Sequence, residues 1–297
     1  VDVANAHWTC HHWVRGACLY GIMPANGMSY NPPHPCACYL DAKLSGFNAL
    51  APASNAWRPR HDAPDEGRLL QNAQNAIPES GPEAADSDWP TYRGSAARSG
   101  FVKAAVPATG LKRSWRAELG GKLSPPVIAG GRVFVAAVDR HEIVALDSGS
   151  GARLWGYTAG GRVDSPPTIW RGRVLFGCAD GHVYCLRATD GALAWRFRAA
   201  PEDRRHFAFE QIESVWPVSG SVLVQDGVLY CVAGRSMFLD GGLRMLRLDP
   251  ATGKKLSETV MDENDPATKS NLQSHVRGLN MPVALADVLS KIGRAHV

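Results

Sequence analysis

The chain has 297 residues, of which 45% are hydrophobic and 20% are charged, and its formal net charge at pH 7 is +4. This composition is ordinary for a globular protein and excludes a fibrous or wholly disordered chain. Basic and acidic residues are interspersed and no run of eighteen apolar residues occurs, so the sequence predicts neither a nucleic-acid partner nor a membrane-spanning helix.

Residues 1–51 predict part of a β-sheet. An extended segment through Trp13 precedes "CLYGIM", and Asn26-Gly27 is a two-residue hairpin signal between that segment and "MSY", with "FNALA" following. The same stretch is rich in cysteine and histidine, including Cys10, Cys18, Cys36, Cys38 and His34. No CxxC or HExxH spacing accompanies them, so disulfides, unpaired thiols and a metal or redox site all remain open. A disulfide between Cys36 and Cys38 would be strained, so each of these cysteines would need another partner.

Residues 52–87 are rich in Ala, Pro, Asn and acidic residues and have little apolar periodicity. We interpret them as a linker that holds one short helix around residues 66–76.

Beyond the linker, the sequence repeats with a period of about forty residues. Three tryptophans are spaced forty residues apart: Trp115, Trp155 and Trp195. Gly151 and Gly191 each precede the next Trp by four positions. A degraded copy keeps the glycine as Gly253 and has Ser257 in place of Trp.

Each repeat predicts four short strands. In the first, "PVIA" and "RVFVAAV" are divided by Gly130-Gly131, a two-residue hairpin signal, and "EIVAL" and "RLWGYTA" follow. Four antiparallel strands, here called A to D in chain order, with this period are typical of a β-propeller blade. We expect each Trp to wedge between adjacent blades and bury on the order of 200 Å².

Two cysteines flank Asp180-Gly181, which is the hairpin signal between strands B and C of the next repeat. If these two residues alone form the loop, Val183 faces Cys178 and Phe176 faces Cys185. The cysteines are then diagonal neighbours about 7 Å apart, too far for a disulfide, so we expect small buried apolar residues.

The pattern "ALDxxTGxxxW" and the opening segment "DWPTYRGSAARSG" at 88–100 resemble the pyrroloquinoline-quinone-like (PQQ-like) propeller repeats. The chain also resembles large bacterial secreted-type proteins of undefined activity. The resemblance implies an all-β propeller of about eight four-stranded antiparallel blades, located in the periplasm or outside the cell. Only about four blades and the start of a fifth near residue 283 are recognisable, so we interpret the chain as a fragment.

These observations divide the chain into four predicted parts. A partial blade at 1–51 and the linker at 52–87 precede PQQ-like blades at 88–291. The last six residues, "IGRAHV" at 292–297, fit no pattern upstream, and we interpret them as an adapter-derived artefact.

Strand alternation puts D-to-A and B-to-C connections on one face of a propeller. Three such connections are extended, at 198–216, 234–242 and 32–46, and extended loops on a rigid scaffold often bind ligands. The candidate binding residues are Arg204, Arg205, His206, Arg235 and Asp240. Solvated loops without a ligand are the alternative.

Three functions fit these features: a binding scaffold, a PQQ-dependent dehydrogenase, and a Cys/His metal or redox protein. The dehydrogenases resemble one another in a vicinal cysteine pair over the quinone, and no two cysteines are adjacent here. Their calcium ligands have no counterpart that a motif identifies. We therefore favour a non-catalytic scaffold that binds a protein or small molecule, with no catalytic residue and no cofactor assigned.

Overall fold

Residue contacts divide the chain into two units, and the repeats lie in the second. The computed structural model describes residues 3–6, 14–16, 18–33, 46–51, 63–78, 81–105, 107–208, 210–272, 288–292 and 295–296. The first unit comprises Val1–His61, Ser236–Leu243 and Met261–Leu285. The second comprises Asp62–Arg235, Arg244–Val260 and Ala286–Val297.

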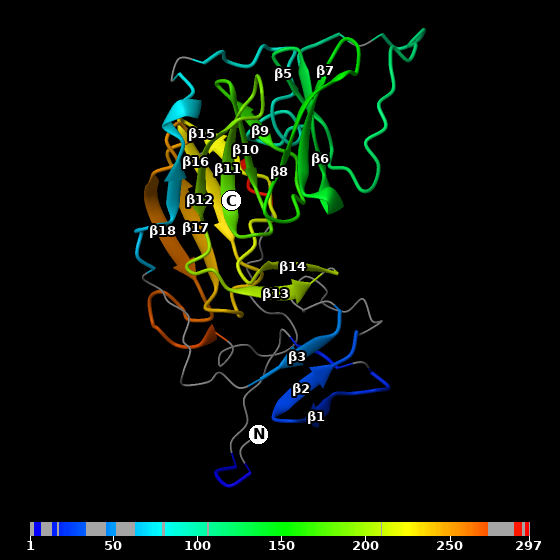
Figure 1. Ribbon diagram of the computed structural model, residues 1–297. Coiled ribbons are helices and arrows are strands. Elements are labelled where there is room, and N and C mark those ends of the chain that lie inside the picture. Colours follow the sequence, from blue (N-terminus) through cyan, green and yellow to red (C-terminus); the bar gives the residue numbers. More distant parts are fainter. Residues whose placement is uncertain are drawn as a thin grey trace. The chain divides into compact units, whose positions relative to one another are not determined.

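The repeats form three blades of four antiparallel strands each, called blades I to III, and the sheet of blade II has a fifth strand described below (Figure 1). Blade I consists of β5 (Val127–Ala129), β6 (Arg132–Ala137), β7 (Glu142–Asp147) and β8 (Arg153–Thr158). Blade II consists of β9 (Thr168–Trp170), β10 (Arg173–Gly177), β11 (His182–Arg187) and β12 (Leu193–Arg198). Blade III consists of β15 (Leu223–Gln225), β16 (Val228–Ala233), β17 (Leu243–Leu248) and β18 (Lys255–Met261). The predicted all-β blade architecture is confirmed.

Strands A and B of blade I are joined by the predicted two-residue hairpin. Ala129 pairs with Arg132, and Gly130 and Gly131 have φ of 56° and 73°. Two consecutive positive φ angles are the geometry of a type I′ turn, which glycine adopts without strain.

The B-to-C turn of blade II differs from the prediction by one residue. Phe176 pairs with Tyr184 and Leu175 with Cys185, while the Cys178 amide donates to the His182 carbonyl at 3.0 Å. The loop therefore has three residues, because the Asp180 carboxylate accepts from the His182 amide at 3.0 Å and stabilises the longer turn. The expected pairing of Phe176 with Cys185 is wrong, but both cysteines are fully buried free thiols.

Each repeat tryptophan lies against a glycine of the following C-to-D turn. A Cβ on Gly191 would come within 2.6 Å of the Trp155 ring, and one on Gly253 within 2.6 Å of the Trp195 ring. The Trp155 indole nitrogen also donates to the Ala188 carbonyl at 3.1 Å. Trp115 makes the same pair of contacts with Gly151 and the Ser148 carbonyl. The indoles thus join successive repeats by both packing and hydrogen bonding.

Blades I and II share one hydrophobic core. Phe134, Ile143 and Trp155 of blade I pack in one cluster with Phe176 and Tyr184 of blade II. The Phe176 and Tyr184 rings are stacked with centroids 5.2 Å apart. Because these side chains are at least nine-tenths buried, the cluster contributes the hydrophobic free energy that holds the two sheets face to face.

The segment 88–98 contacts the A strands of blades I and II and the residue that precedes the A strand of blade III. Trp89 forms a β-bridge with Ile128, the Ile169 amide donates to the Pro90 carbonyl at 2.7 Å, and Arg98 donates to the Val222 carbonyl at 3.3 Å. Burial lowers the pKa of Arg98 to about 10, and the group remains charged at neutral pH. This segment therefore ties the inner strands of the blades together.

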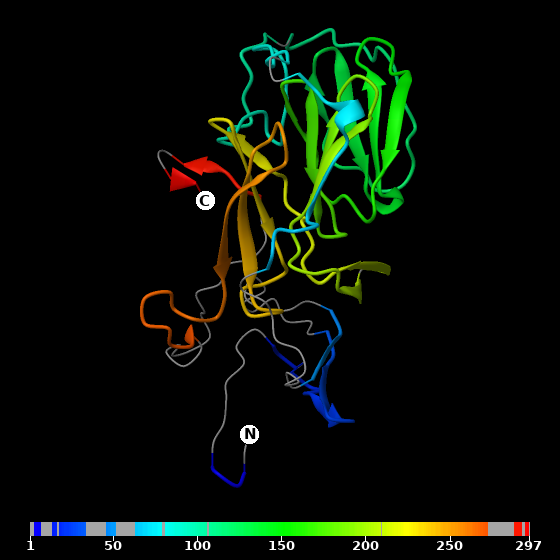
Figure 2. The same cartoon turned by 60° about the vertical axis from the view of Figure 1, so that its left-hand side comes forward.

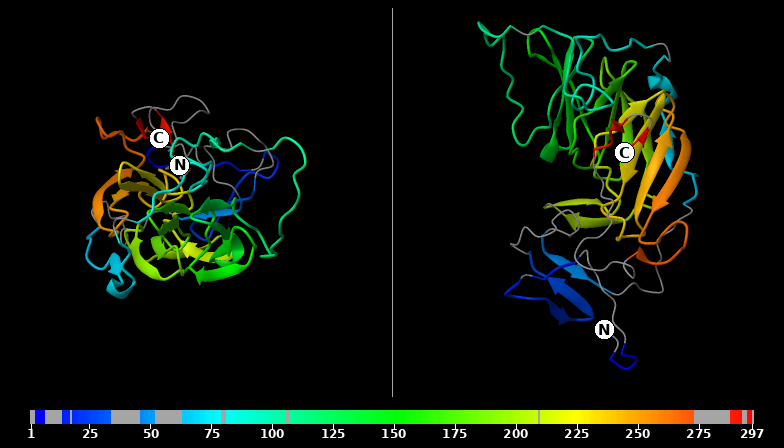
Figure 3. Two further views of the ribbon diagram at one scale, coloured as in Figure 1. Left: turned by 90° about the horizontal axis from the view of Figure 1, so that it is seen from above. Right: turned by 180° about the vertical axis from the view of Figure 1, so that it is seen from behind.

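A further strand, β4 (Leu69–Gln71), extends blade II at its outer edge and comes from the predicted linker. It pairs antiparallel with β12, so that Leu70 faces Arg196, and is followed by the 3-10 helix η2 (Ala73–Asn75). Figure 3 shows this cyan segment beside the orange β18. Arg68, next to β4, contacts Glu258 of β18, which is 190 residues later in the chain. The helix is therefore shorter than the one predicted around residues 66–76, and Leu69–Gln71 of that segment form a strand.

The first unit contains a three-stranded sheet of β1 (Met23–Ala25), β2 (Met28–Asn31) and β3 (Asn48–Leu50). Asn26-Gly27 forms the predicted turn, with Ala25 paired to Met28, but the first strand begins at Met23 and not at Cys18.

The other described elements are η3 (Val138–Arg140), β13 (Arg205–Ala208), β14 (Gln211–Ser214), β19 (Lys291–Ile292) and β20 (Ala295–His296). Within the described residues, no helix has the length and apolarity needed to cross a bilayer.

Candidate functional site: the β13–β14 hairpin and its polar support

The long connection between blades II and III folds into a hairpin of β13 and β14 (Figure 2). His206 pairs with Glu213, and Phe207 pairs with Ile212. Because side chains alternate along a strand, these two pairs lie on opposite faces of the hairpin. One face is polar and largely buried, and the other is apolar and exposed.

Ion pairs and hydrogen bonds anchor the polar face. Glu213, whose side chain is 3% exposed, lies 2.9 Å from Arg162 Nη2 and 3.3 Å from His206 Nε2. Arg162 also contacts Asp164 at 2.6 Å, and Gln211 Oε1 lies 2.7 Å from His141 Nε2. Burial lowers the pKa of Arg162, but the two carboxylates outweigh burial and raise it. The hairpin is thus fixed by the buried ion pair of Glu213 with Arg162 and by the contact of Gln211 with His141.

A second buried cluster lies next to Arg162, around Asp180. The Tyr184 hydroxyl donates to Asp180 Oδ2 at 2.5 Å, and the Ala179 amide donates to the Arg162 carbonyl at 2.7 Å. A Cβ on Gly160 would clash with the Asp180 carboxylate. Burial raises the pKa of Asp180, but hydrogen bonds from His182 and Tyr184 outweigh it and hold the pKa at about 2. Burial, together with the Asp180 charge, raises the pKa of Tyr184.

The polar side chains of these two clusters bind one another and are shielded from solvent. Asp180 and Arg162 are each 7% exposed, and Tyr184 is 1% exposed. A buried carboxylate that is already matched by donors supports structure more readily than proton transfer to a substrate. We therefore regard the clusters as the support of the hairpin.

The opposite face of the hairpin presents two large apolar side chains to solvent. Phe207 is 72% exposed and Ile212 is 64% exposed. Arg205 is exposed beside them and lies 3.0 Å from Asp203. An exposed aromatic residue next to a charged one is typical of residues that bind a protein partner.

The predicted candidate residues have different surroundings. Arg204 and Arg205 are exposed at the start of the hairpin, and the His206 side chain is 23% exposed beside Glu213. Arg235 is half-buried after β16, and Asp240 is half-buried in the first unit. Residues 34–45 of the third insertion lie outside the described residues. A shared face for the three insertions therefore stays a prediction.

The predicted cysteine and histidine cluster also stays untested. Cys10, His34, Cys36 and Cys38 lie outside the described residues, whereas Cys18 is exposed and its sulfur accepts from Arg15 at 3.3 Å. In the described part of the chain, no three His, Cys, Asp or Glu side chains are grouped so as to hold a metal ion. Burial raises the pKa of the Cys178 thiol, and raises that of Cys231 to about 12.

Arg162, Asp180 and Glu213 were not among the predicted binding residues, although Asp180 was predicted in a turn and Glu213 lies in the predicted insertion 198–216. The sequence does contain a signal for Arg162. The similar segments "GGKLSPP" and "GGRVDSPP" precede successive repeats and place Lys122 and Arg162 forty residues apart. The arginine therefore occupies a repeated position in a D-to-A connection. Glu213 has no repeated counterpart, since it belongs to the insertion.

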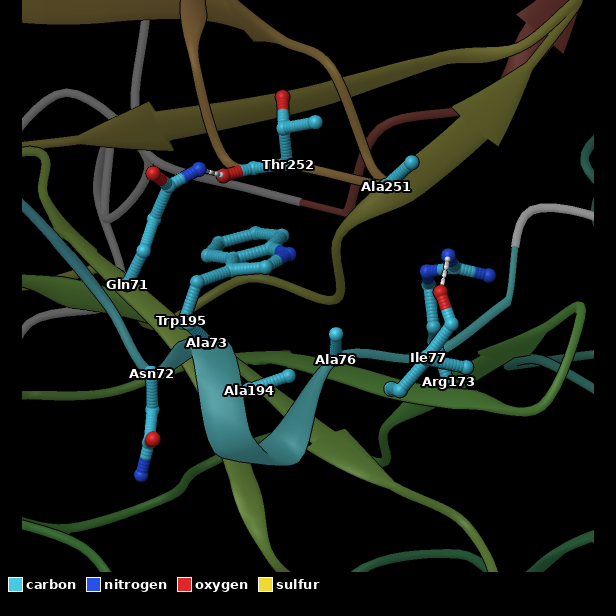
Figure 4. Close-up of a pocket in the computed structure, with 10 residues that line it drawn as sticks. All are labelled: Gln71, Asn72, Ala73, Ala76, Ile77, Arg173, Ala194, Trp195, Ala251 and Thr252. Carbon is cyan, nitrogen blue, oxygen red and sulfur yellow. Dashed lines mark hydrogen bonds between the residues drawn. The ribbon is translucent and has the colours of Figure 1, made fainter.

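A cavity of about 330 Å³ lies elsewhere in the second unit, between β4, η2 and the turn that precedes β18 (Figure 4). Trp195 and several alanines line it. Gln71 donates to the Thr252 carbonyl at 2.8 Å across one side, and Arg173 donates to the Ile77 carbonyl at 2.9 Å on the other. None of the predicted binding residues lines this cavity.

A family model described as outer membrane protein assembly factor BamB (PQQ_2) matches residues 98–288, which include blades I to III. The chain belongs to this family. Its β-propeller fold and PQQ-like repeats agree with the resemblance that the tryptophan and glycine spacing indicated.

Two curated relatives match shorter stretches. Outer membrane protein assembly factor BamB of Nitrosomonas eutropha is 34% identical over 93 residues, which are 31% of this chain and 22% of that protein. The dehydrogenase subunit of alcohol dehydrogenase (quinone) of Gluconobacter oxydans is 29% identical over 107 residues, 31% of this chain and 14% of that protein. The chain thus matches less than a quarter of either relative.

Among solved structures, the quinohemoprotein alcohol dehydrogenase of Comamonas testosteroni matches 62% of this chain and 29% of its own length. The TM-score is 0.47 and the identity is 22%.

The relation to quinone-dependent enzymes raises the question of whether the described residues fit a quinone. Arg162 and Asp180 are buried and already bound to neighbouring side chains. The described cysteines, Cys18, Cys178, Cys185 and Cys231, include no adjacent pair. These side chains are therefore not available to a quinone, and we assign none of the described residues a role toward it.

Proposed function

We propose that this family member is a protein-binding scaffold, located in the periplasm or outside the cell, and that the exposed face of the β13–β14 hairpin is its docking surface. The observation that carries the proposal is the pairing of Phe207 and Ile212, which are 72% and 64% exposed, on a hairpin whose other face is anchored by buried ion pairs. The name of one relative, an outer membrane protein assembly factor, supports a protein partner.

The physical argument concerns the cost of binding. A mobile loop loses conformational entropy when a partner orders it, whereas a hairpin held by the Glu213–Arg162 and Gln211–His141 contacts is already ordered. Burying the two apolar side chains then supplies free energy at about 25 cal/mol per Å². Arg204 and Arg205 at the edge favour a partner with carboxylates beside an apolar patch.

The test is site-specific photo-cross-linking in cells that produce the full-length protein. A benzophenone amino acid at Phe207 is expected to capture one protein partner. Phe101 is the matched control, because it is an exposed phenylalanine, 69% accessible, far from the hairpin in sequence. Equal cross-linking from both positions would contradict the proposal.

A binding measurement with the captured partner completes the test. Replacing Phe207 and Ile212 with serine is expected to weaken the complex at least tenfold without lowering the melting temperature, because both side chains are exposed. The competing dehydrogenase function predicts that pyrroloquinoline quinone, added with calcium, stays with the protein through gel filtration and gives its absorption band.

A further inference from the structure

The outer edge of blade II shows how a blade of this chain binds an extended peptide. The Arg198 amide donates to the Arg68 carbonyl, and the Asn72 amide donates to the Ala194 carbonyl, each at 2.8 Å. Segment 68–72 therefore adds a fifth strand to β12, although Arg68 and Arg198 are 130 residues apart in the sequence. The peptide groups of every second residue of β12 face this added strand.

Side-chain contacts hold this strand in place in addition to its backbone hydrogen bonds. Leu69 packs where Trp195 meets Gly253. The Arg68 guanidinium lies 4.9 Å from the centroid of the Phe197 ring and donates to the Ala199 carbonyl at 3.0 Å and to Glu258 at 2.8 Å. The fifth strand of blade II is thus recognised by an apolar contact and by a carboxylate of the following blade.

Blade I has the same edge without a strand on it. Strand β8 is the terminal strand of its sheet (Figure 1), and no described segment pairs with its outer side. Leu154, Gly156 and Thr158 lie forty residues before Ala194, Arg196 and Arg198, so their peptide groups face outward. All three are exposed, and Leu154 is 46% accessible.

The charge that such a strand would meet is reversed relative to blade II. Gly253 and Gly191 occupy the same turn position, so Arg196 in blade II corresponds to Glu258 in blade III. Arg196 acts electrostatically on Tyr157, the counterpart of Phe197, because burial raises the pKa of Tyr157 and the Arg196 charge opposes that rise. Around β8, Arg153 and Arg140 share the single carboxylate of Glu142. A carboxylate on the added strand therefore fits where Arg68 fits in blade II.

We propose that the outer edge of β8 is a second binding site, which takes an extended segment of another protein as a fifth strand with an acidic side chain facing Arg196 and an apolar residue after it. This site is separate from the hairpin surface, and either can exist without the other. Backbone pairing supplies affinity and the acidic side chain supplies specificity.

The test compares two labelled peptides on the full chain. The first is EGRLLQNA, residues 66–73, and the second is EGELLQNA, which carries the change Arg68→Glu. Fluorescence anisotropy is expected to show the Glu peptide binding at least tenfold more tightly. With Arg196→Glu in the protein, the preference is expected to reverse. Equal binding of the two peptides, or failure of either to bind at millimolar concentration, would overturn the proposal.

Two edge variants locate the site. Leu154→Pro removes an outward amide and is expected to abolish binding of the Glu peptide, whereas Leu154→Ala keeps the amide and is expected to retain it. Both melting temperatures are measured, and if Leu154→Pro unfolds, hydrogen exchange of the wild-type chain decides. Protection of residues 153–158 by the Glu peptide supports the proposal, and protection elsewhere refutes it. Tighter binding of the Arg peptide would instead identify the β4 segment of a second copy as the occupant.

Discussion

At the residue scale, one contact recurs with the period of the sequence: an indole covers a glycine of the next repeat. Trp155 covers Gly191 and Trp195 covers Gly253, with the same ring atoms closest in both cases. Because the glycine has no side chain, the ring reaches the backbone of the turn, where its nitrogen finds a carbonyl. The glycine is therefore required for space as well as for its positive φ.

Two glycine substitutions separate these requirements. Gly130 and Gly191 have positive φ of 56° and 74°, but a Cβ on Gly130 meets nothing within 4 Å. We expect Gly130→Ala to cost about 1 kcal/mol from backbone strain. Gly191→Ala adds a clash with Trp155 and is expected to cost about 2–4 kcal/mol. Urea unfolding measures both, and equal costs would mean that the indole shifts without penalty.

Asp180 makes stability depend on acid pH. Its pKa is about 2 in the folded chain, against about 3.9 for an unperturbed aspartate. A depressed folded pKa contributes stability above the unfolded value, and that stability is lost as pH falls from about 4 to about 2. We expect the contribution to be about 2–3 kcal/mol at neutral pH. Asp180→Asn should remove this part of the pH dependence, which unfolding at pH 7, 4 and 2.5 measures. A variant that keeps the wild-type slope would assign the titration to another group.

At the element scale, β4 is held to its blade by one buried charge. Arg68 is 2% exposed and bridges the carbonyls of Arg198, the last residue of β12, and Ala199 to Glu258 of β18. Hydrogen bonds outweigh the effect of burial and lower the pKa of Glu258. The strand therefore connects blades II and III in addition to the Trp195 contact.

Removing this charge is expected to release β4. In Arg68→Leu, Glu258 keeps Arg244 and Lys255, so we expect a loss of about 2–4 kcal/mol, somewhat below that of breaking an isolated buried pair. Amides of residues 194–198 should exchange faster. Lys103→Leu is the control, because Lys103 and Asp86 are both exposed at 4.0 Å, and its cost should stay below about 1 kcal/mol. Unchanged exchange at residues 194–198 would show that backbone pairing alone holds the strand.

Elements with a repeated local pattern were predictable from the sequence, and those with a distant partner were not. The blades follow from the forty-residue spacing and from turns such as Gly130-Gly131, because both are local signals. Strand β4 lacks the repeat and its contact partners lie far along the chain. The turn at Asp180-Gly181 was assigned one residue too short, because Asp-Gly suits two-residue and three-residue loops alike. Of the hairpin site, the sequence indicated the insertion but not Glu213, whose role depends on tertiary contacts with Arg162.

At the scale of the repeat array, stability is expected to reside in interfaces between successive blades. Blades I and II share the core that contains Trp155 and Tyr184. Blades II and III share the contact of Trp195 with Gly253 and the bridge from Arg68 to Glu258. Segment 88–98 contacts the A strands of blades I and II and Val222, which precedes the A strand of blade III. A change at one interface should therefore be felt mainly by other groups of that interface.

Double-mutant cycles test this localisation. Trp155→Ala and Trp195→Ala are each expected to cost about 3–5 kcal/mol, as for other large buried side chains. Arg68→Leu combined with Trp195→Ala should cost at least about 1 kcal/mol less than the sum, because either change already opens the same interface. Arg68→Leu combined with Trp155→Ala should be additive within about 0.5 kcal/mol, since these residues belong to different interfaces. Urea unfolding of the three single and two double variants, followed by circular dichroism, measures both couplings. Equal coupling free energies in the two cycles would contradict this localisation and would mean that coupling does not depend on sharing an interface.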